Sequence, residues 1–301
     1  MKLGLCCISE ILKDKGFSFQ TITRKRFLSL PREEAKKVVH DRTINNLQVT
    51  SRIIKHCAQN NIKHYRLSSS LFPAYTDQQC FDSWEEVKSY SLYKDLLSKC
   101  GKLLKQNNIT VSTHPSQYIV MFNKDDKIIN NSIIDLELHG WIHDCLDLPQ
   151  DYSNPINIHP TGTFESVQDA FDIFVNNLNK LSDSAKKRLV LENCDKAYWN
   201  MEKLFEFWQY YNHTTNQDLP LTFDNLHNEC NKPSDLFGYF LKTWRDFTPI
   251  FHWSEGGANG KIRSHVDYFS NIPQIILDNP QIIWECEVKA KDKAILKILN
   301  K

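Results

Sequence analysis

Six apolar runs in this sequence each carry a histidine or a carboxylate at or near their C-terminal end. The runs cover residues 109–115, 154–160, 189–195, 219–225, 248–254 and 282–288. In order, the side chains are His114, His159, Glu192, Asp224, His252 and the pair Glu285 and Glu287. His227 and His265 follow the fourth and fifth runs. All of these residue types bind divalent metals, so the pattern predicts a metal site if the ends of the runs meet.

Each of these residues, taken alone, has a simpler interpretation. A single histidine at a strand end is more often a hydrogen-bonded core residue than a ligand. Asp224 alone could cap the helix that follows it, and Glu192 alone could accept a hydrogen bond from a backbone amide. Together they favour a metal cluster, because several buried imidazoles and carboxylates would otherwise lack partners. Five of the 11 histidines belong to this set.

His139 and His143 do not fit the same pattern. They lie four residues apart on a predicted helix, a spacing that can bind zinc. The corresponding zinc motif needs a glutamate directly after the first histidine, and Gly140 stands there. We interpret both as packing or surface residues, and Cys194, Cys230 and Cys286 as bystanders near the predicted ligands.

The elements that must position these side chains alternate along the chain. Two further apolar runs, 3–9 and 62–69, bring the number to eight, and from the third onward they begin about every 30 to 45 residues. Amphipathic helical patterns between them include 83–106, 165–181 and 200–211. The runs are nearly continuous, as in strands buried on both faces. This predicts one α/β domain over 1–301, a (β/α)8 TIM barrel, whose strand ends converge on one mouth.

A doubly wound open sheet is the competing fold. Neither GxGxxG nor GxxxxGK[ST] occurs in the chain, so the usual nucleotide-binding support for that fold is missing.

Composition limits the remaining function classes. The net charge is only +1, so nucleic-acid binding would depend on local charge. The nine cysteines include no CxxC motif. With no recognisable signal peptide and no long apolar span, we expect an intracellular, monomeric protein that does not contact a membrane.

Several close divalent ions sharing carboxylates suit the hydrolysis of phosphate esters. A smaller site of two carboxylates and a histidine would suit a sugar isomerase or epimerase, and that alternative stays open. HPSQY (114–118) places Gln117 and Tyr118 just past the first predicted ligand. This pair could enter a duplex and stack on a base, or simply belong to an ordinary loop.

Longer stretches of the sequence resemble the UV-damage endonucleases, which share a barrel superfamily with the apurinic endonucleases and xylose isomerases. The matching stretches are LGLCC, HYRLSSSLFP (64–73), STHPSQY (112–118), NIHPTG (157–162), LVLENCDKAYWN (189–200), FDNLHNECN (223–231), FHWSEG (251–256), RSHVDYF (263–269) and EVKAKDKAIL (287–296). The resemblance implies nicking of damaged double-stranded DNA immediately 5′ of UV photoproducts, with other lesions such as abasic sites as further candidates. The products would carry 3′-hydroxyl and 5′-phosphate ends.

The resemblance also implies up to three divalent metals, commonly Mn2+, with Zn2+ or Mg2+ as alternatives. One would be held by His114, His159 and Glu192. A second would share Glu192 and add the further ligands Asp224, His252 and Glu287. His227 and His265 would hold the third. Glu192, Asp224, His252 and Glu287 would be the catalytic group, and Gln117 and Tyr118 would probe the duplex.

Positively charged residues supply candidates for phosphate contacts: Arg66, Lys261, Arg263 and the TRKR stretch (23–26). Three positions depart from the family pattern. Leu5, Ser70 and Ile250 replace a tyrosine, a histidine and a lysine found in some members, which bears on lesion range, metal preference and rate. A non-catalytic barrel that binds damage is the remaining alternative.

Overall fold

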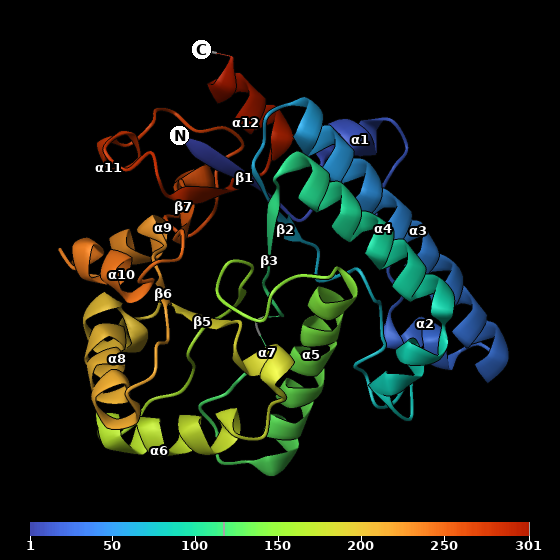
Figure 1. The fold of residues 1–301 in the computed structure, drawn as a ribbon, viewed down its shortest axis with the longest axis horizontal. Coiled ribbons are helices and arrows are strands. Elements are labelled where there is room, and N and C mark those ends of the chain that lie inside the picture. Colours follow the sequence, from blue (N-terminus) through green and yellow to red (C-terminus); the bar gives the residue numbers. More distant parts are fainter. Residues whose placement is uncertain (117, 301) are drawn as a thin grey trace.

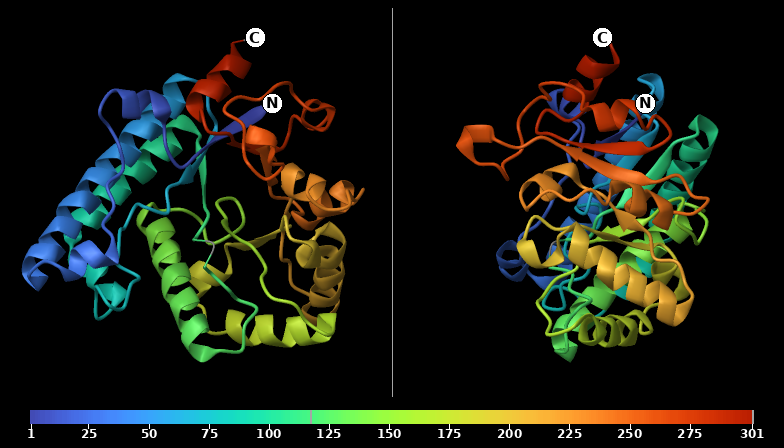
Figure 2. Two further views of the ribbon diagram at one scale, coloured as in Figure 1. Left: turned by 180° about the vertical axis from the view of Figure 1, so that it is seen from behind. Right: turned by 90° about the vertical axis from the view of Figure 1, so that its left-hand side faces the viewer.

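Eight parallel strands form one sheet in the computed structural model, which describes residues 1–116 and 118–300. They are β1 (Lys2–Cys6), β2 (His64–Leu67), β3 (Thr110–Thr113), β4 (Ile156–Ile158), β5 (Leu189–Glu192), β6 (Leu221–Thr222), β7 (Ile250–Ser254) and β8 (Ile283–Glu287). Strands β1 to β6 pair in sequence order, β1 also pairs with β8, and β8 pairs with β7. N- and C-terminal elements therefore lie together, as the views in Figures 1 and 2 show.

The barrel closes between β6 and β7 through a narrow seam. An isolated parallel bridge joins Asp224 to His252. The His252 backbone N–H also donates to the carbonyl of Phe223 at 2.8 Å. This closure confirms the predicted (β/α)8 barrel, and it passes through two of the predicted metal ligands.

Helices surround the strands in Figure 1, with α3 and α4 side by side. The α-helices are α1 (Glu10–Asp14), α2 (Arg24–Leu28), α3 (Arg32–Gln59), α4 (Ser91–Asn107), α5 (Asp126–Cys145), α6 (Val167–Leu178), α7 (Asp183–Lys186), α8 (Met201–Thr215), α9 (Asn225–Glu229), α10 (Phe237–Thr243), α11 (Gln274–Leu277) and α12 (Asp292–Leu299). Short 3-10 helices are η1 (Trp84–Ser89), η2 (Ala197–Trp199) and η3 (Ala258–Gly260). The long first connection contains α1, α2 and α3.

The predicted helices exist, but some of their boundaries differ. The pattern at 165–181 forms α6, which starts where the Ser166 hydroxyl accepts from the Asp169 amide at 3.1 Å. The pattern at 83–106 divides into η1 and α4, because Tyr90 has extended backbone angles.

The strands are buried nearly throughout, which explains their continuous apolar runs. β2, β5 and β7 have no exposed residue, and large side chains such as Phe251, Trp253 and Trp284 fill the surroundings of β7 and β8. Among the described residues, no helix is both long enough and apolar enough to cross a membrane.

Candidate metal centre

The predicted ligands lie on six strands, β3 to β8, or on the segments that follow them. His114 and His159 each follow the last residue of a strand, β3 and β4, whereas Glu192 and Glu287 are the final residues of β5 and β8. His252 lies in the middle of β7 rather than at its end. Because all strands are parallel, these positions meet at the carboxyl end of the barrel.

Glu192 is the centre of the cluster, with a side chain that is only 1% exposed. Its Oε2 lies 3.2 Å from His114 Nε2 and 3.7 Å from His159 Nε2. Its Oε1 lies 3.1 Å from His227 Nδ1 and 3.2 Å from His252 Nδ1. Burial would raise the pKa of Glu192, but the surrounding imidazoles, His159 and His252 foremost, hold it well below its ordinary value.

His114, His159 and Glu192 form one compact donor group, whose ligand atoms all lie within 4.8 Å of one another. Burial lowers the pKa of His159 to about 4, so this imidazole is neutral at physiological pH. A neutral imidazole has a free lone pair and can coordinate a metal. The Sγ of Cys194 lies 3.5 Å from His159 Nδ1 and leaves Nε2 turned toward Glu192.

Asp224 uses its two carboxylate oxygens differently. Oδ1 accepts the backbone N–H of His227 at 2.8 Å and so caps α9. Oδ2 faces the cluster, 3.8 Å from His252 Nδ1 and 3.9 Å from His227 Nδ1. Capping and a role in the cluster are therefore compatible, although the sequence presented them as alternatives.

His252 completes a second donor group with Asp224 and Glu287, and its ligand atoms also lie within 4.8 Å of one another. Nδ1 of His252 is 3.4 Å from Glu287 Oε1 and 3.2 Å from Glu192 Oε1. Although buried, this nitrogen has no hydrogen-bond partner among the described residues. An unpaired imidazole nitrogen facing three carboxylates fits a divalent cation, which would satisfy all four groups at once.

The two histidines predicted for a third metal do not lie in one group. His227 lies with Glu192 and Asp224, all three ligand atoms within 4.8 Å. Burial would lower the pKa of His227, but Asp224 and Glu192 raise it to about 10. His265 stands at the edge of the site, where Nε2 is 4.0 Å from Glu287 Oε2 and the side chain is 30% exposed.

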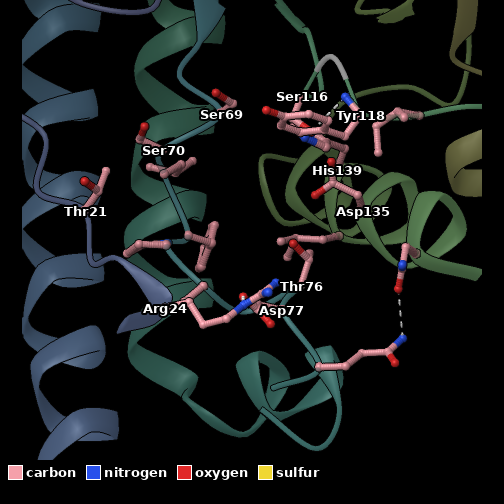
Figure 3. Close-up of a pocket in the computed structure, with 18 of the residues that line it drawn as sticks. Thr21, Arg24, Ser69, Ser70, Thr76, Asp77, Ser116, Tyr118, Asp135 and His139 are labelled. Atoms are coloured by element: carbon pink, nitrogen blue, oxygen red, sulfur yellow. Dashed lines mark hydrogen bonds and ion pairs between the residues drawn. The ribbon is translucent and has the colours of Figure 1, made fainter. Parts of the chain in front are cut away.

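Tyr118, predicted to probe the duplex, is 78% exposed and borders a large polar pocket (Figure 3). The pocket has a volume of about 950 Å3 and lies between the segments that follow β2 and β3. Its wall includes Ser69, Ser70, Asp135 and His139. Gln117, the other member of the predicted pair, lies outside the described residues.

The candidates for phosphate contacts have different surroundings. Lys261 is exposed. Arg263 is also exposed, and its Nε pairs with Asp195 at 2.9 Å. Arg66 is 8% exposed and its guanidinium contacts Glu285 and Glu287. Because the long side chain turns into the barrel, the structure places Arg66 beside the cluster instead of on a surface open to DNA.

Several side chains that contact the predicted ligands were not singled out from the sequence. Asn157 Nδ2 donates to Glu192 Oε2, and Asn193 bonds the backbone of Asp224 through both amide atoms, at 2.8 and 3.0 Å. The spacing in the sequence could have identified Asn157. It lies two positions before His159, and residues two apart on a strand face the same side.

The sequence matches the UV-endonuclease UvdE family over residues 1–301. It is 30% identical over 306 residues to the UV DNA damage endonuclease of Nostoc sp. strain PCC 7120, with 98% of this chain and 88% of that protein covered.

Comparison with solved structures supports the barrel fold. The crystal structure of SacUVDE matches with a TM-score of 0.81 and 25% identity, covering 100% of this chain and 99% of that one. Endonuclease IV from Thermus thermophilus matches with a TM-score of 0.58 and 10% identity, covering 100% and 97% respectively. At that identity, the second comparison supports the barrel fold alone.

Proposed function

The chain belongs to the UV-endonuclease UvdE family, and on that premise we propose that it nicks damaged double-stranded DNA immediately 5′ of UV photoproducts. The nick leaves a 3′-hydroxyl and a 5′-phosphate. The observation that carries the proposal is the position of Glu192, whose two oxygens each face a different pair of imidazoles. This arrangement suits a carboxylate shared between neighbouring cations.

We propose a set of ligands for each cation, following the family resemblance. His114, His159 and Glu192 would hold the first. Glu192, Asp224, His252 and Glu287 would hold the second, and the last three of these form one donor group. His227 and His265, which do not share a donor group, would hold the third. Manganese is the metal we propose, with zinc or magnesium as the alternatives to test. When bound, such ions supply a water of lowered pKa and stabilise charge on the phosphate and the leaving oxygen.

The protein's own residues keep the donors in place. Asn157 donates to Glu192 Oε2, and this hydrogen bond fixes the orientation of the carboxylate. Asn193 clamps the backbone of Asp224, and the cap on α9 fixes that side chain's rotation. Preformed donors of this kind need little reorganisation when substrate arrives.

Side chains at the rim of the barrel would recognise the damaged DNA. Tyr118 is available to stack on a base, since 78% of it is exposed, and we propose that Gln117 acts beside it. Lys261 and Arg263 lie on the segment between β7 and α11 and would contact backbone phosphates.

A nicking assay tests the proposal. Purified protein is incubated with UV-irradiated or untreated supercoiled plasmid in Mn2+, Mg2+ or Zn2+, and the ends of the nick are mapped on a duplex carrying one photoproduct. We expect nicking of irradiated plasmid only. Glu192→Gln should abolish it, whereas Glu206→Gln, a change at an exposed residue of α8, should not.

Absence of nicking in every divalent metal would refute the proposal. Binding to irradiated plasmid without nicking would then favour the non-catalytic barrel. The family match already decides against a sugar isomerase.

A further inference from the structure

Glu285 lies two residues before Glu287 on β8, so both side chains point into the barrel, with Glu285 one layer deeper. Its side chain is 1% exposed. It contacts His64 Nε2 at 2.9 Å, Arg66 Nη1 at 3.0 Å, His252 Nε2 at 3.2 Å, the Ser112 hydroxyl, and Cys6 Sγ at 4.0 Å. Both carboxylate oxygens therefore have donors.

The contact with His252 determines what that histidine presents to the metal centre. Nε2 of His252 lies 3.2 Å from Glu285 Oε2 and 3.5 Å from Asn157 Nδ2. When this nitrogen carries the proton and donates to the nearer carboxylate, the opposite nitrogen Nδ1 carries the lone pair. That nitrogen faces Glu192, Asp224 and Glu287 at 3.2, 3.8 and 3.4 Å. A histidine that binds metal commonly donates its other ring nitrogen to a carboxylate, which fixes both the tautomer and the ring plane.

Arg66 lies between Glu285 and Glu287 and keeps Glu285 out of the donor set. The guanidinium bonds both Glu285 and Glu287. Cys6, Glu285 and Glu287 have closely spaced ligand atoms. A cation already occupies the space between the two glutamates, however, and that cation is the side chain of Arg66.

His64 holds the second oxygen of the Glu285 carboxylate, Oε1. Its Nε2 is 2.9 Å from Glu285 Oε1, while its Nδ1 bonds the Thr110 hydroxyl at 2.8 Å. Gly4 on the neighbouring strand makes room for this ring, because a Cβ there would lie 2.9 Å from His64 Cδ2. Glu285 thus has partners on four strands besides its own, β1, β2, β3 and β7.

We propose that Glu285 is a positioning residue that, supported by Arg66 and His64, orients His252 for binding a divalent cation. The inference rests on the proposed function of the same site, but it concerns metal affinity rather than turnover. It assigns no direct contact with substrate or metal to Glu285. Loss of such a supporting carboxylate lowers metal affinity by about 10- to 100-fold in characterised sites.

Calorimetric titration of Mn2+ into metal-stripped protein tests the inference, with thermal melting of the same metal-free samples as a check on folding. Glu285→Met removes the acceptor, and we expect Mn2+ to bind about 10- to 100-fold more weakly at the His252 site. Glu285→Gln fits the same space. Its amide can turn toward Ser112 and His64 and leave an oxygen for His252, so the loss should be smaller.

Asp292→Asn is the matched control. Asp292 is also a buried carboxylate paired with a histidine, His56 Nε2 at 3.0 Å, and it accepts hydrogen bonds from the Ser9 hydroxyl and from the backbone N–H groups of Glu10 and Ile11. This change should lower the melting temperature without altering Mn2+ affinity. If Glu285→Met fails to fold, the Mn2+ affinity of Glu285→Gln tests the inference instead.

Unchanged Mn2+ affinity in folded Glu285 variants would overturn the inference, as would failure of the unaltered protein to bind a divalent metal. A protein that binds Mn2+ but does not nick irradiated DNA would refute the proposed function and leave the inference standing.

Discussion

Truncation of Tyr118 separates damage recognition from the metal centre. The side chain is 78% exposed, and the hydrogen bond recorded for this residue is made by its backbone N–H, to the Ser116 hydroxyl at 3.4 Å. Tyr118→Ala therefore removes an aromatic surface and almost no packing. We expect the free energy of unfolding to change by less than about 0.5 kcal/mol, as for other exposed positions.

The expected loss in binding follows from stacking. A base stacked on an aromatic side chain contributes about 1–3 kcal/mol by alanine substitution. At 1.4 kcal/mol per factor of ten, this corresponds to about 5- to 150-fold weaker binding of a duplex that carries a photoproduct. Tyr118→Phe keeps the ring and should retain most of the affinity.

Fluorescence anisotropy with labelled duplexes measures this effect at one fixed salt concentration, since phosphate contacts are strongly salt-dependent. The matched control is Tyr239→Ala, because Tyr239 on α10 is also exposed, at 51%. The control should bind both duplexes as the unaltered protein does. An equal loss of affinity for damaged and undamaged duplex in Tyr118→Ala would refute stacking at the lesion, as would an unchanged affinity for the damaged one.

Three further predictions concern the site and the fold. Glu192→Gln should reduce nicking below detection while circular dichroism remains native, because the amide keeps the volume of a side chain that faces four imidazoles. Removing bound metal with EDTA should lower the free energy of unfolding by about 2.7 kcal/mol relative to protein with metal at 100 times its dissociation constant, as measured by urea denaturation. Burial would raise the pKa of Asp292, but hydrogen bonds from His56 and Ser9 lower it below its ordinary value. Its stabilisation is therefore present above the unfolded-state pKa of about 3.9 and is lost as the pH falls through the folded value. Asp292→Asn should cost about 1.5–3 kcal/mol near neutral pH and flatten the acid side of the stability profile.

The barrel was predictable because its strands are buried on both faces. Runs such as 189–195 and 248–254 are long, apolar and regularly spaced, and their burial in β5 and β7 follows from that composition. Helix boundaries were less predictable. Tyr90 interrupts the pattern at 83–106 through its backbone angles, and no residue type in that stretch requires the interruption.

The predicted ligands could be brought together from sequence because strand ends in a parallel barrel must meet. The buried side chains that contact these ligands from below were harder to predict. Ser112 and Asn157 each lie two positions before a predicted ligand that directly follows the strand, so the period of two could have identified them. Glu285 was named together with Glu287, but its position one layer deeper was not. Arg66 was harder to place. A long cationic side chain at a strand end can turn toward solvent or inward, and only the partners Glu285 and Glu287 decide the direction.

The closure of the barrel between β6 and β7 involves two of the predicted metal ligands. Strands β6 and β7 are joined by a single bridge between Asp224 and His252, whereas β8 shares longer ladders with β7 and β1. The side chains of these two residues belong to one donor group with Glu287. A cation held there would bind the closed barrel better than one whose seam has opened, and would stabilise closure by that difference in affinity. Without a cation, His252 supplies the only imidazole in that donor group, and its pKa is raised above the ordinary value because Glu192 and Glu285 outweigh the effect of burial. Positive charge at the seam, from a cation or from His252, therefore offsets the repulsion between the carboxylates that gather there.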